Sequence, residues 1–546
     1  MQSRRSFWGW GNEGEGADAQ ALAAAEAGLR TFLGLTELTA QAPPHLDAIE
    51  LPPSRLELPQ EPRLQAMVTA DRYERARHCY GRSYRDLVRG LRGDFRAAPD
   101  LVAFPENEDD IAALMAFCAR RRIALIPYGG GTSVCGGIEA DVGSGFGGSL
   151  SLDLARLGRV LEIDPISRAA RIQGGALGPD MEAALRPRGL SLRHYPQSFA
   201  FSTLGGWIAT RNSGHFATLH THIDDLVESL RLVTPRGVVA TRRLPASGAG
   251  PAPERFFLGS EGALGVITEA WVRLAERPRF RASATLGFAD FLGGAGFIRA
   301  VAQAGLYPAN LRLLDPLEAL MNGAGTGQAL ALLAFESADH QLGAWLEQAL
   351  RCARDHGATV LAQSQKEEPA RAQGVTERDR GAEPAEHWRT AFLRAPYLRD
   401  ALVQRDLLVE TFETAVTWDR FPAFHRAVTA ATERAIREVC GQGLLTCRLT
   451  HAYPDGVAPY YTVVAPARRG AELEQWAAIK DAATETLLAE GGTTTHHHAV
   501  GRDFRRYYER ERDPLFGHAL SAVKRALDPE GLLNPGVLLA PGSGPP

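Results

Sequence analysis

The clearest chemical feature of the sequence is a glycine-rich run, PYGGGTSVCGG, at residues 127–137. Consecutive glycines let backbone amides approach an anionic group that side chains would otherwise keep away. The run differs from the dinucleotide-binding fingerprint of a doubly wound sheet, since the G-x-G-x-x-G spacing and an acidic residue about 20 positions later are both missing. It therefore indicates a pyrophosphate-binding loop of another type, although a tight turn alone would also use such glycines.

Two later segments strengthen this interpretation. They are PQSFAFSTLGGWIATRNSG at residues 196–214 and GSEGALGVITE at residues 259–269. Both combine small residues, hydroxyl groups and free backbone amides, which suit a diphosphate and the edge of an isoalloxazine ring. Together, the three segments predict a site for a flavin nucleotide.

A third feature is the histidine run at residues 496–498, within TTTHHHAVG. Imidazoles exchange protons near neutral pH and also bind metal ions, although a run of histidines can equally be a solvated loop with no functional role. The run is internal, so it is no terminal tag. Its small neighbours favour a site.

Bulk properties limit what the whole protein can be. The chain has 546 residues, and 45% of them are apolar. This length is greater than a single hydrophobic core usually supports, so we predict at least two lobes. With 60 basic and 64 acidic residues the net charge is −4, so no excess of positive charge favours a polyanion. We expect no nucleic-acid partner.

Cysteine usage and the N-terminus indicate the compartment. The cysteines form no C-x-x-C pair and no zinc-site spacing, which is typical of buried thiols in a reducing environment. The six are Cys79, Cys118, Cys135, Cys352, Cys440 and Cys447. No apolar stretch follows the N-terminal arginines as in a signal peptide, and none later reaches about 18 residues. We predict a cytoplasmic protein that does not span a membrane.

The elements that must hold these loops follow from the periodicity. From residue 101 the pattern is strand, helix, strand, with ALIPYGGGTS read as a strand that runs into the glycines. More strands are predicted up to about residue 277, and alternating helices and strands beyond it, including a helix-rich charged stretch from Ala370 to Glu410. The first 95 residues, with a helix near 17–33 and a proline-rich linker at 42–62, look like an appendage.

The three loops, in this order, resemble the FAD-binding domain of the vanillyl-alcohol oxidase and p-cresol methylhydroxylase superfamily. The resemblance implies an α+β, two-lobed flavoprotein with a PCMH-type FAD-binding domain and an α/β substrate-binding cap domain. It implies four parts: an N-terminal region at 1–95, the FAD domain at 96–277, the cap at 278–515, and a C-terminal segment at 516–546 that returns to the FAD domain.

The same resemblance implies which residues line the FAD. They are Pro127, Tyr128, Gly129, Gly130, Gly131, Thr132, Ser133, Pro196, Gln197, Ser198, Phe199, Ala200, Phe201, Ser202, Thr210, Arg211, Asn212, Ser213, Ser260, Glu261, Gly262, Ala263, Leu264, Gly265 and Val266. Superfamily members that tether the flavin often carry a histidine directly after the glycines, where this chain has Thr132. We therefore expect non-covalent FAD.

Within the superfamily, nearly the whole chain from Trp8 onward resembles the alkyldihydroxyacetonephosphate synthase family. The segments that carry the likeness are LRLLD at 311–315, residues 397–420, CRLTHAYPDGVAPYY at 447–461 and GGTTTHHHAVG at 491–501. Such enzymes exchange the acyl chain of an acyl dihydroxyacetone phosphate for a fatty alcohol, which makes an ether-lipid precursor without net redox change. The flavin N5 serves there as a covalent trap.

The resemblance also implies roles for six residues of this sequence. Tyr460 matches the acid/base tyrosine, Arg399 a substrate-binding arginine and Arg312 an arginine needed for activity, and His496, His497 and His498 complete the predicted site. A phenol needs nearby positive charge or hydrogen-bond donors to act as a base at neutral pH. Viewed alone, Tyr460 would be a cross-strand aromatic and Arg399 a solvated surface residue. His451 and Tyr453 are further candidates to face the substrate.

The alternative is an FAD-dependent oxidase or dehydrogenase of a 2-hydroxy acid, of the D-lactate or glycolate type. Those enzymes share an H-x-G-D-G-N-x-H segment that binds a divalent metal, whereas this chain has HAYPDGVAPYY, and we expect no metal. In favour of that alternative, NPG at 534–536 and Ala499 depart from the synthase pattern. A non-enzymatic FAD scaffold is disfavoured, because all the implied site residues are present.

The expected partner is a small-molecule or lipid substrate. A long-chain substrate needs an apolar tunnel, and peripheral contact with a membrane is left open, as is a homodimer. The chain ends in GSGPP with no S-K-L signal, which fits the cytoplasmic prediction.

Overall fold

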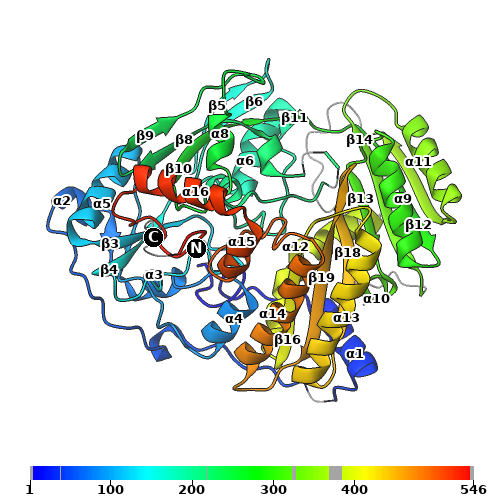
Figure 1. The fold of residues 1–546 in the computed structure, drawn as a ribbon, viewed down its shortest axis with the longest axis horizontal. Coiled ribbons are helices and arrows are strands. Elements are labelled where there is room, and N and C mark those ends of the chain that lie inside the picture. Colours follow the sequence, from blue (N-terminus) through cyan, green and yellow to red (C-terminus); the bar gives the residue numbers. More distant parts are fainter. Residues whose placement is uncertain are drawn as a thin grey trace.

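The computed structural model describes residues 4–540 apart from 37, 217, 220, 322–326 and 368–383, and of residues 384–391 only the backbone. The start of the charged stretch predicted from Ala370 lies outside the described residues. Two lobes lie side by side, with the first on the left of Figure 1 and the second on the right. The predicted two-lobed α+β architecture is confirmed.

A small sheet in the first lobe carries the glycine loop. Its order is β1-β2-β4-β3, in which β2, β4 and β3 are parallel. Its members are β1 (Val68–Thr69), β2 (Leu101–Ala103), β3 (Ile123–Tyr128) and β4 (Gly148–Asp153), with helix α5 (Glu108–Arg121) between β2 and β3. Asn107 caps α5, and acids in its first turn and arginines in its last suit the helix dipole. Because β3 ends at Tyr128, the glycines begin directly at its carboxyl end.

The second sheet of the first lobe is antiparallel, in the order β5-β6-β10-β8-β9. Its members are β5 (Val160–Asp164), β6 (Ala169–Gln173), β8 (Val227–Thr234), β9 (Gly237–Ala240) and β10 (Val266–Arg273), accompanied by α6 (Gly178–Leu185), α7 (Leu204–Thr210), α8 (Pro253–Phe257) and the short pair β7 (Leu190–Ser191) and β11 (Ala275–Glu276). The Thr203 hydroxyl caps α7, and this helix packs against β6 and β10 of the sheet.

An antiparallel sheet forms the second lobe, in the order β15-β12-β14-β13-β18-β19-β16, with β17 beside β19. Its strands are β12 (Phe280–Phe288), β13 (Asn310–Leu314), β14 (Ala329–Ser337), β15 (Thr359–Glu367), β16 (Leu407–Glu413), β17 (Val416–Thr417), β18 (Leu444–Ala452) and β19 (Gly456–Pro466). Its helices are α9 (Phe291–Gln303), α10 (Pro316–Met321), α11 (Gly343–Asp355), α12 (Pro384–Val403), α13 (Phe421–Cys440) and α14 (Glu472–Ala489). Helices α9, α11, α13 and α14 share one apolar core with the sheet.

The N-terminal region is not an appendage, contrary to the sequence-based interpretation. Its helices are α1 (Ala19–Leu33), α2 (Pro62–Gln65), α3 (Arg72–Arg77) and α4 (Tyr84–Leu91). Leu29 and Leu33 of α1 pack against Leu407 of β16, and Leu87 of α4 belongs to the core of the second lobe. Helices this short are stable only when an apolar face is packed. Leu64 of α2 belongs to the core of the first lobe, so this region packs against both lobes.

The C-terminal segment, red in Figure 1, crosses the first lobe with α15 (Arg505–Glu511) and α16 (Pro514–Leu527). Leu533 then forms a parallel bridge with Leu125 of β3. Among the described helices, none combines the length and apolar character that a bilayer span requires.

Candidate active site

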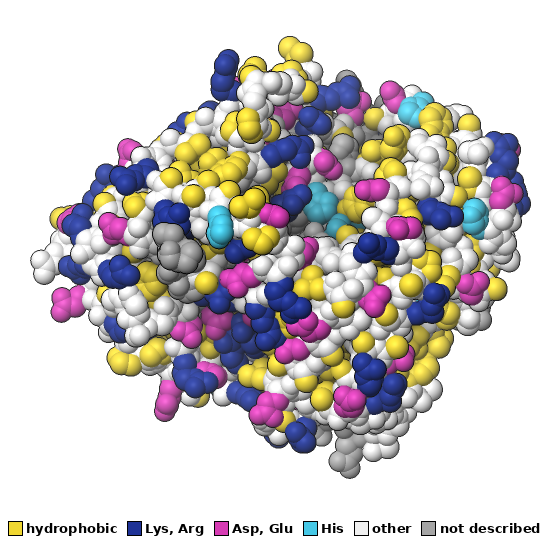
Figure 2. All heavy atoms as spheres, in the orientation of Figure 1, with side chains coloured by type: hydrophobic (Ala, Val, Ile, Leu, Met, Phe, Trp, Pro, Cys, Tyr) yellow, Lys and Arg dark blue, Asp and Glu magenta, His cyan; other side chains and the backbone are white. Residues whose placement is uncertain are grey.

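The predicted site residues surround a cavity between the two lobes. Its first-lobe wall consists of residues 129–134 and residues from 196 to 214, and its second-lobe wall of β13, β18, β19, α12 and the histidine loop. Figure 2 shows histidine side chains in the hollow between the lobes, with basic side chains at its edge. Trp10 of the N-terminal region also lines this cavity, which the sequence analysis did not predict.

Close packing explains the glycine loop. A Cβ atom at Gly130 would lie 1.7 Å from the carbonyl oxygen of Phe201, and Gly131 has a φ of +71°. Only glycine fits both conditions, because other residues would clash or be strained. The loop is thereby pressed against residues 201–203, and its glycines line the cavity.

About half of the residues predicted to bind FAD line this cavity. They are Gly129, Gly130, Gly131, Thr132, Ser133, Pro196, Gln197, Ser198, Ser202, Thr210, Asn212 and Ser213. The buried Ser213 hydroxyl has no hydrogen-bond partner within the described part of the chain, so a polar ligand group would satisfy it. The free amides and this hydroxyl fit the polar groups of FAD.

The remaining residues with a predicted FAD role are not part of this lining. They are Pro127, Tyr128, Phe199, Ala200, Phe201, Arg211 and the loop Ser260, Glu261, Gly262, Ala263, Leu264, Gly265 and Val266. Glu261 accepts hydrogen bonds from the amides of Val500 (2.9 Å) and Gly501 (2.8 Å), directly after the histidine run. Burial raises the pKa of Glu261 to about 7 although both amides lower it. Asn534, noted above only as a departure from the synthase pattern, donates to the carbonyls of Gly137 and Glu261 and so joins two of the loops.

Two paired strands bring Tyr460 and Arg448 together on the second-lobe wall. The two residues are cross-strand partners in β19 and β18, and Cζ of Arg448 lies 4.1 Å from the centre of the Tyr460 ring. Nη1 of Arg448 is bound at 2.6 Å to Oε1 of Glu318. Burial raises the pKa of Tyr460, and the neighbouring Arg448 charge opposes this rise. The sequence analysis assigned no role to Arg448, because only its position in a strand could have indicated one.

Among the described residues, the other two arginines of the wall also have buried donors that find no partner. Arg312 on β13 is 1% exposed, and its Nη2 donates to the carbonyl of His215 at 3.0 Å. Its Nε and Nη1 have no partner among the described residues. Burial and the Arg448 charge lower the pKa of Arg312 to about 9, so it stays charged at pH 7. Arg399 on α12 contacts Asp400 at 3.3 Å, while its Nε likewise finds no described partner.

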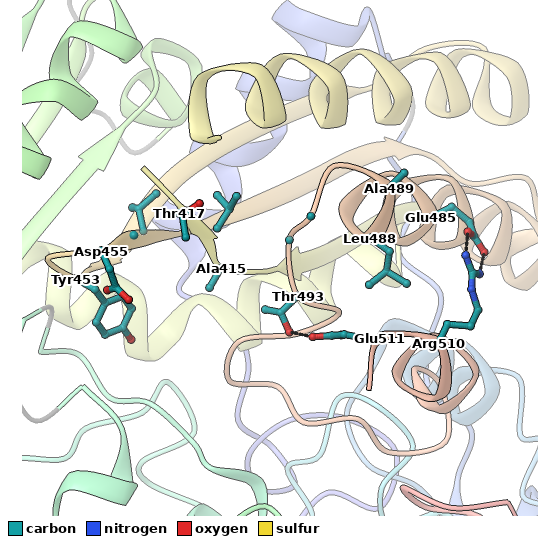
Figure 3. Close-up of a pocket in the computed structure, with 15 residues that line it drawn as sticks. Ala415, Thr417, Tyr453, Asp455, Glu485, Leu488, Ala489, Thr493, Arg510 and Glu511 are labelled. Carbon is teal, nitrogen blue, oxygen red and sulfur yellow. Dashed lines mark hydrogen bonds and ion pairs between the residues drawn. The ribbon is translucent and has the colours of Figure 1, made fainter. Parts of the chain in front are cut away.

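A second cavity, of about 770 Å³, opens beside β17, α14 and α15 (Figure 3). Its lining includes Thr417, Asp455, Thr493, Glu511 and Tyr453. The sequence made Tyr453 a candidate to face the substrate, but the structure places it at this second cavity and outside the lining of the first.

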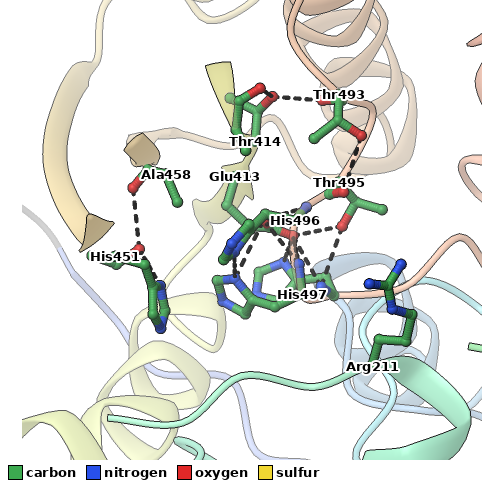
Figure 4. Close-up of polar contacts among 12 residues, drawn as sticks. Arg211, Glu413, Thr414, His451, Ala458, Thr493, Thr495, His496 and His497 are labelled. Atoms are coloured by element: carbon green, nitrogen blue, oxygen red, sulfur yellow. Dashed lines mark hydrogen bonds and ion pairs between the residues drawn. The ribbon is translucent and has the colours of Figure 1, made fainter. Parts of the chain in front are cut away.

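A buried carboxylate holds the histidine loop in place. Glu413, at the end of β16, accepts hydrogen bonds from the amides of His496 (2.6 Å), His497 (3.2 Å) and His498 (3.0 Å) and from the Thr495 hydroxyl (2.6 Å), as Figure 4 shows. Burial raises the pKa of Glu413, but the histidines and Thr495 outweigh it and hold the pKa below its usual value. Glu413 was missed because a single acid in an apolar strand carries no motif.

The histidines themselves differ in position. His497 and His498 line the first cavity, and His496 lies behind them. Burial lowers the pKa of His496 well below its usual value and that of His497 to about 3, so both are neutral at pH 7. The ring nitrogens of His451, His496 and His497 approach within 4.8 Å of one another, a spacing that could hold a metal ion. Both nitrogens of His451 already have partners, Oγ1 of Thr450 (3.0 Å) and the carbonyl of Gly214 (3.1 Å).

Comparison with known proteins covers both lobes. A family model described as FAD binding domain matches residues 99–242, and one described as FAD linked oxidases, C-terminal domain, matches residues 277–538. The alkyldihydroxyacetonephosphate synthase of Trypanosoma brucei brucei is 30% identical over 515 residues, covering 90% of this chain and 82% of the relative. The glycolate oxidase subunit GlcD of Bacillus subtilis is 28% identical, covering 82% of this chain and 90% of the relative.

Solved structures show the same fold. A structure of an alkyldihydroxyacetonephosphate synthase aligns with a TM-score of 0.80 at 23% identity, covering 97% of this chain and 98% of the other. A structure of p-cresol methylhydroxylase aligns with a TM-score of 0.66 at 14% identity, covering 88% of this chain and 95% of the other. The architecture of FAD lobe and cap is therefore shared across both.

Proposed function

Because the chain belongs to the alkyldihydroxyacetonephosphate synthase family, and is thus an FAD-dependent enzyme, we propose that it exchanges the acyl chain of an acyl dihydroxyacetone phosphate for a fatty alcohol. The product would be an ether-lipid precursor, formed without net oxidation. Bound along the glycine loop, FAD would supply an electrophilic ring for the reaction. We propose that it is held without a covalent bond, since Thr132 stands where superfamily members that tether the flavin often carry a histidine.

The observation that carries this proposal is the arginine-rich wall opposite the FAD loops. The substrate brings a phosphate and loses a carboxylate, so its site needs cations that are not already neutralised. Arg312 supplies such a cation, because it has no ion pair among the described residues and two of its donors lack partners there. Arg399 is ion-paired with Asp400 but keeps its buried Nε without a described partner. A buried unpaired guanidinium is costly in the free protein, and an anionic ligand removes that cost.

Tyr460 is the residue we assign to proton transfer. The carbon beside the ketone must lose a proton, and Tyr460 lines the same cavity as Arg312, Arg399 and His497. Burial keeps the phenol protonated at rest, and the Arg448 guanidinium over its ring stabilises the phenolate. Arg448 therefore tunes the base, while the Glu318 carboxylate holds Arg448 in position.

Oxidation of a 2-hydroxy acid is the second candidate, favoured by the FAD-linked oxidase domain and the glycolate oxidase relative. It fits the wall less well, since a small hydroxy acid carries only one anionic group for these arginines.

The two candidates can be separated with FAD-loaded protein under anaerobic conditions. We expect palmitoyl dihydroxyacetone phosphate to bleach the flavin absorbance and release palmitate, and Tyr460→Phe to abolish this change. Bleaching by D-lactate or glycolate alone, reversed by an electron acceptor, would rule out the exchange reaction in favour of a dehydrogenase.

A further inference from the structure

The two cavities approach each other at the histidine loop. His497 lines the first cavity and Tyr453 the second, and His496 lies between them. Nε2 of His496 is 2.7 Å from the Tyr453 hydroxyl, and its Nδ1 is 2.9 Å from Nδ1 of His497. We infer that His497, His496 and Tyr453 form a proton path from the first cavity to the second cavity.

The second cavity is suited to be the outer end of such a path. At about 770 Å³ it has room for many water molecules, each of which occupies about 30 Å³ in the liquid. Side chains of Thr417, Asp455 and Glu511 line it, so water there finds hydrogen-bond partners. The first cavity, in contrast, lies between the two lobes and is lined by the FAD loops.

A second outlet reaches the same histidine. Nε2 of His222 lies 3.1 Å from Nε2 of His496, and Nδ1 of His222 lies 2.9 Å from the carbonyl of Arg211. His222 is half-buried, so its ring is reachable by water. Either Tyr453 or His222 can therefore take up the proton that leaves His496.

The proton transfer conserves the number of protons on the path and leaves no charged intermediate behind. Each neutral imidazole carries one N–H and one lone pair, and two facing Nδ1 atoms must share one hydrogen. When His497 holds that hydrogen, its Nε2 is free to accept a proton from the reaction cavity. His497 then passes its Nδ1 hydrogen to His496, and His496 releases its Nε2 hydrogen to the Tyr453 oxygen or to His222. Tyr453 gives its own hydroxyl hydrogen to water, whereas His222, after taking the hydrogen on Nε2, gives its Nδ1 hydrogen to water. One proton enters, one leaves, and no electrons are transferred.

Glu413 keeps the two rings in register for this transfer. Its carboxylate accepts the amides of His496 and His497, and its Oε2 lies 3.4 Å from Nδ1 of His497. Burial, the first cause in both cases, lowers the pKa of both histidines, so each ring keeps the neutral form that a relay needs. The catalytic use of the path, to remove the substrate proton, rests on the proposed function, whereas the path itself can be tested without substrate.

The test uses FAD-loaded enzyme with ¹⁵N-labelled histidine rings and follows, by NMR, the exchange of ring N–H hydrogens with water. In the wild type we expect a coupling between Nδ1 of His496 and Nδ1 of His497 across the shared hydrogen. We also expect the ring N–H hydrogens to exchange with water through Tyr453 and His222. Tyr453→Phe combined with His222→Asn should slow this exchange about tenfold, the effect of losing a hydrogen bond. The matched control is Tyr461→Phe, because the Tyr461 hydroxyl lies 3.1 Å from Nδ1 of His425, outside the path. We expect the control to exchange like the wild type.

Two results would overturn the inference. One is the absence of coupling between the two Nδ1 atoms in the wild-type protein, which needs no variant to fold. The other is equal exchange rates in the double variant and the wild type. If acyl dihydroxyacetone phosphate fails to bleach the flavin, the proposed function is refuted instead. The NMR measurements would still test the proton path, because they need no substrate.

Discussion

Replacing Arg312 with methionine should increase stability while it lowers activity. The guanidinium is 1% exposed, with one hydrogen bond to His215 and two donors that lack described partners. Methionine fills similar space without a charge, so removing the buried cation should stabilise the FAD-loaded protein by about 1–3 kcal/mol. The two free donors, at about 1.5 kcal/mol each toward an anionic substrate, give about 3 kcal/mol, or roughly 150-fold in kcat/KM.

The assay is denaturant unfolding of wild type and variant together with kcat/KM for palmitoyl dihydroxyacetone phosphate. Arg448→Met is the matched control, since it removes a guanidinium that is paired with Glu318 and so leaves a buried carboxylate without its cation. That variant should lose about 3 kcal/mol of stability. If Arg312→Met destabilises the protein as Arg448→Met does, the reasoning about unpaired donors is wrong.

Three other predictions concern the loops. Gly130→Ala should abolish FAD retention, because its Cβ would lie 1.7 Å from the Phe201 carbonyl; the FAD-to-protein ratio after purification checks this, and a normal ratio contradicts it. Acid precipitation should release all the FAD into the supernatant, and flavin that stays with the protein would show a covalent link. Glu413 has a folded-state pKa below its usual value, so its contribution to stability is full above the unfolded pKa of about 4.3 and is lost as pH falls below it. The unfolding free energies at pH 7 and pH 4 should therefore differ less in Glu413→Gln than in the wild type. An equal difference in the two proteins would show that the Glu413 carboxylate does not stabilise the fold in this way.

The FAD loops could be predicted because local chemistry determines them. Gly130 and Gly131 are required by a clash and by a left-handed backbone, and both constraints appear in sequence as glycine. The strand before them, β3, is an apolar run that ends where the glycines begin. Periodicity and turn residues carry that information within a few positions.

The rest of the site depends on contacts between distant residues, which a single sequence does not encode locally. Trp10 reaches the cavity from the N-terminal region, and Glu413 supports the histidine loop from 83 positions away. Arg448 becomes recognisable only when β18 pairs with β19 and places it over Tyr460. For the same reason the N-terminal region was misread as an appendage, since its packing partners lie in both lobes.

The most direct test of group exchange follows an oxygen label. FAD-loaded protein is incubated anaerobically, without an electron acceptor, with palmitoyl dihydroxyacetone phosphate and ¹⁸O-labelled hexadecanol, and the products are analysed by mass spectrometry. We predict hexadecyl dihydroxyacetone phosphate that carries the label, with one unlabelled palmitate released for each ether formed. Turnover that requires an electron acceptor, or a product without the label, would contradict the exchange reaction.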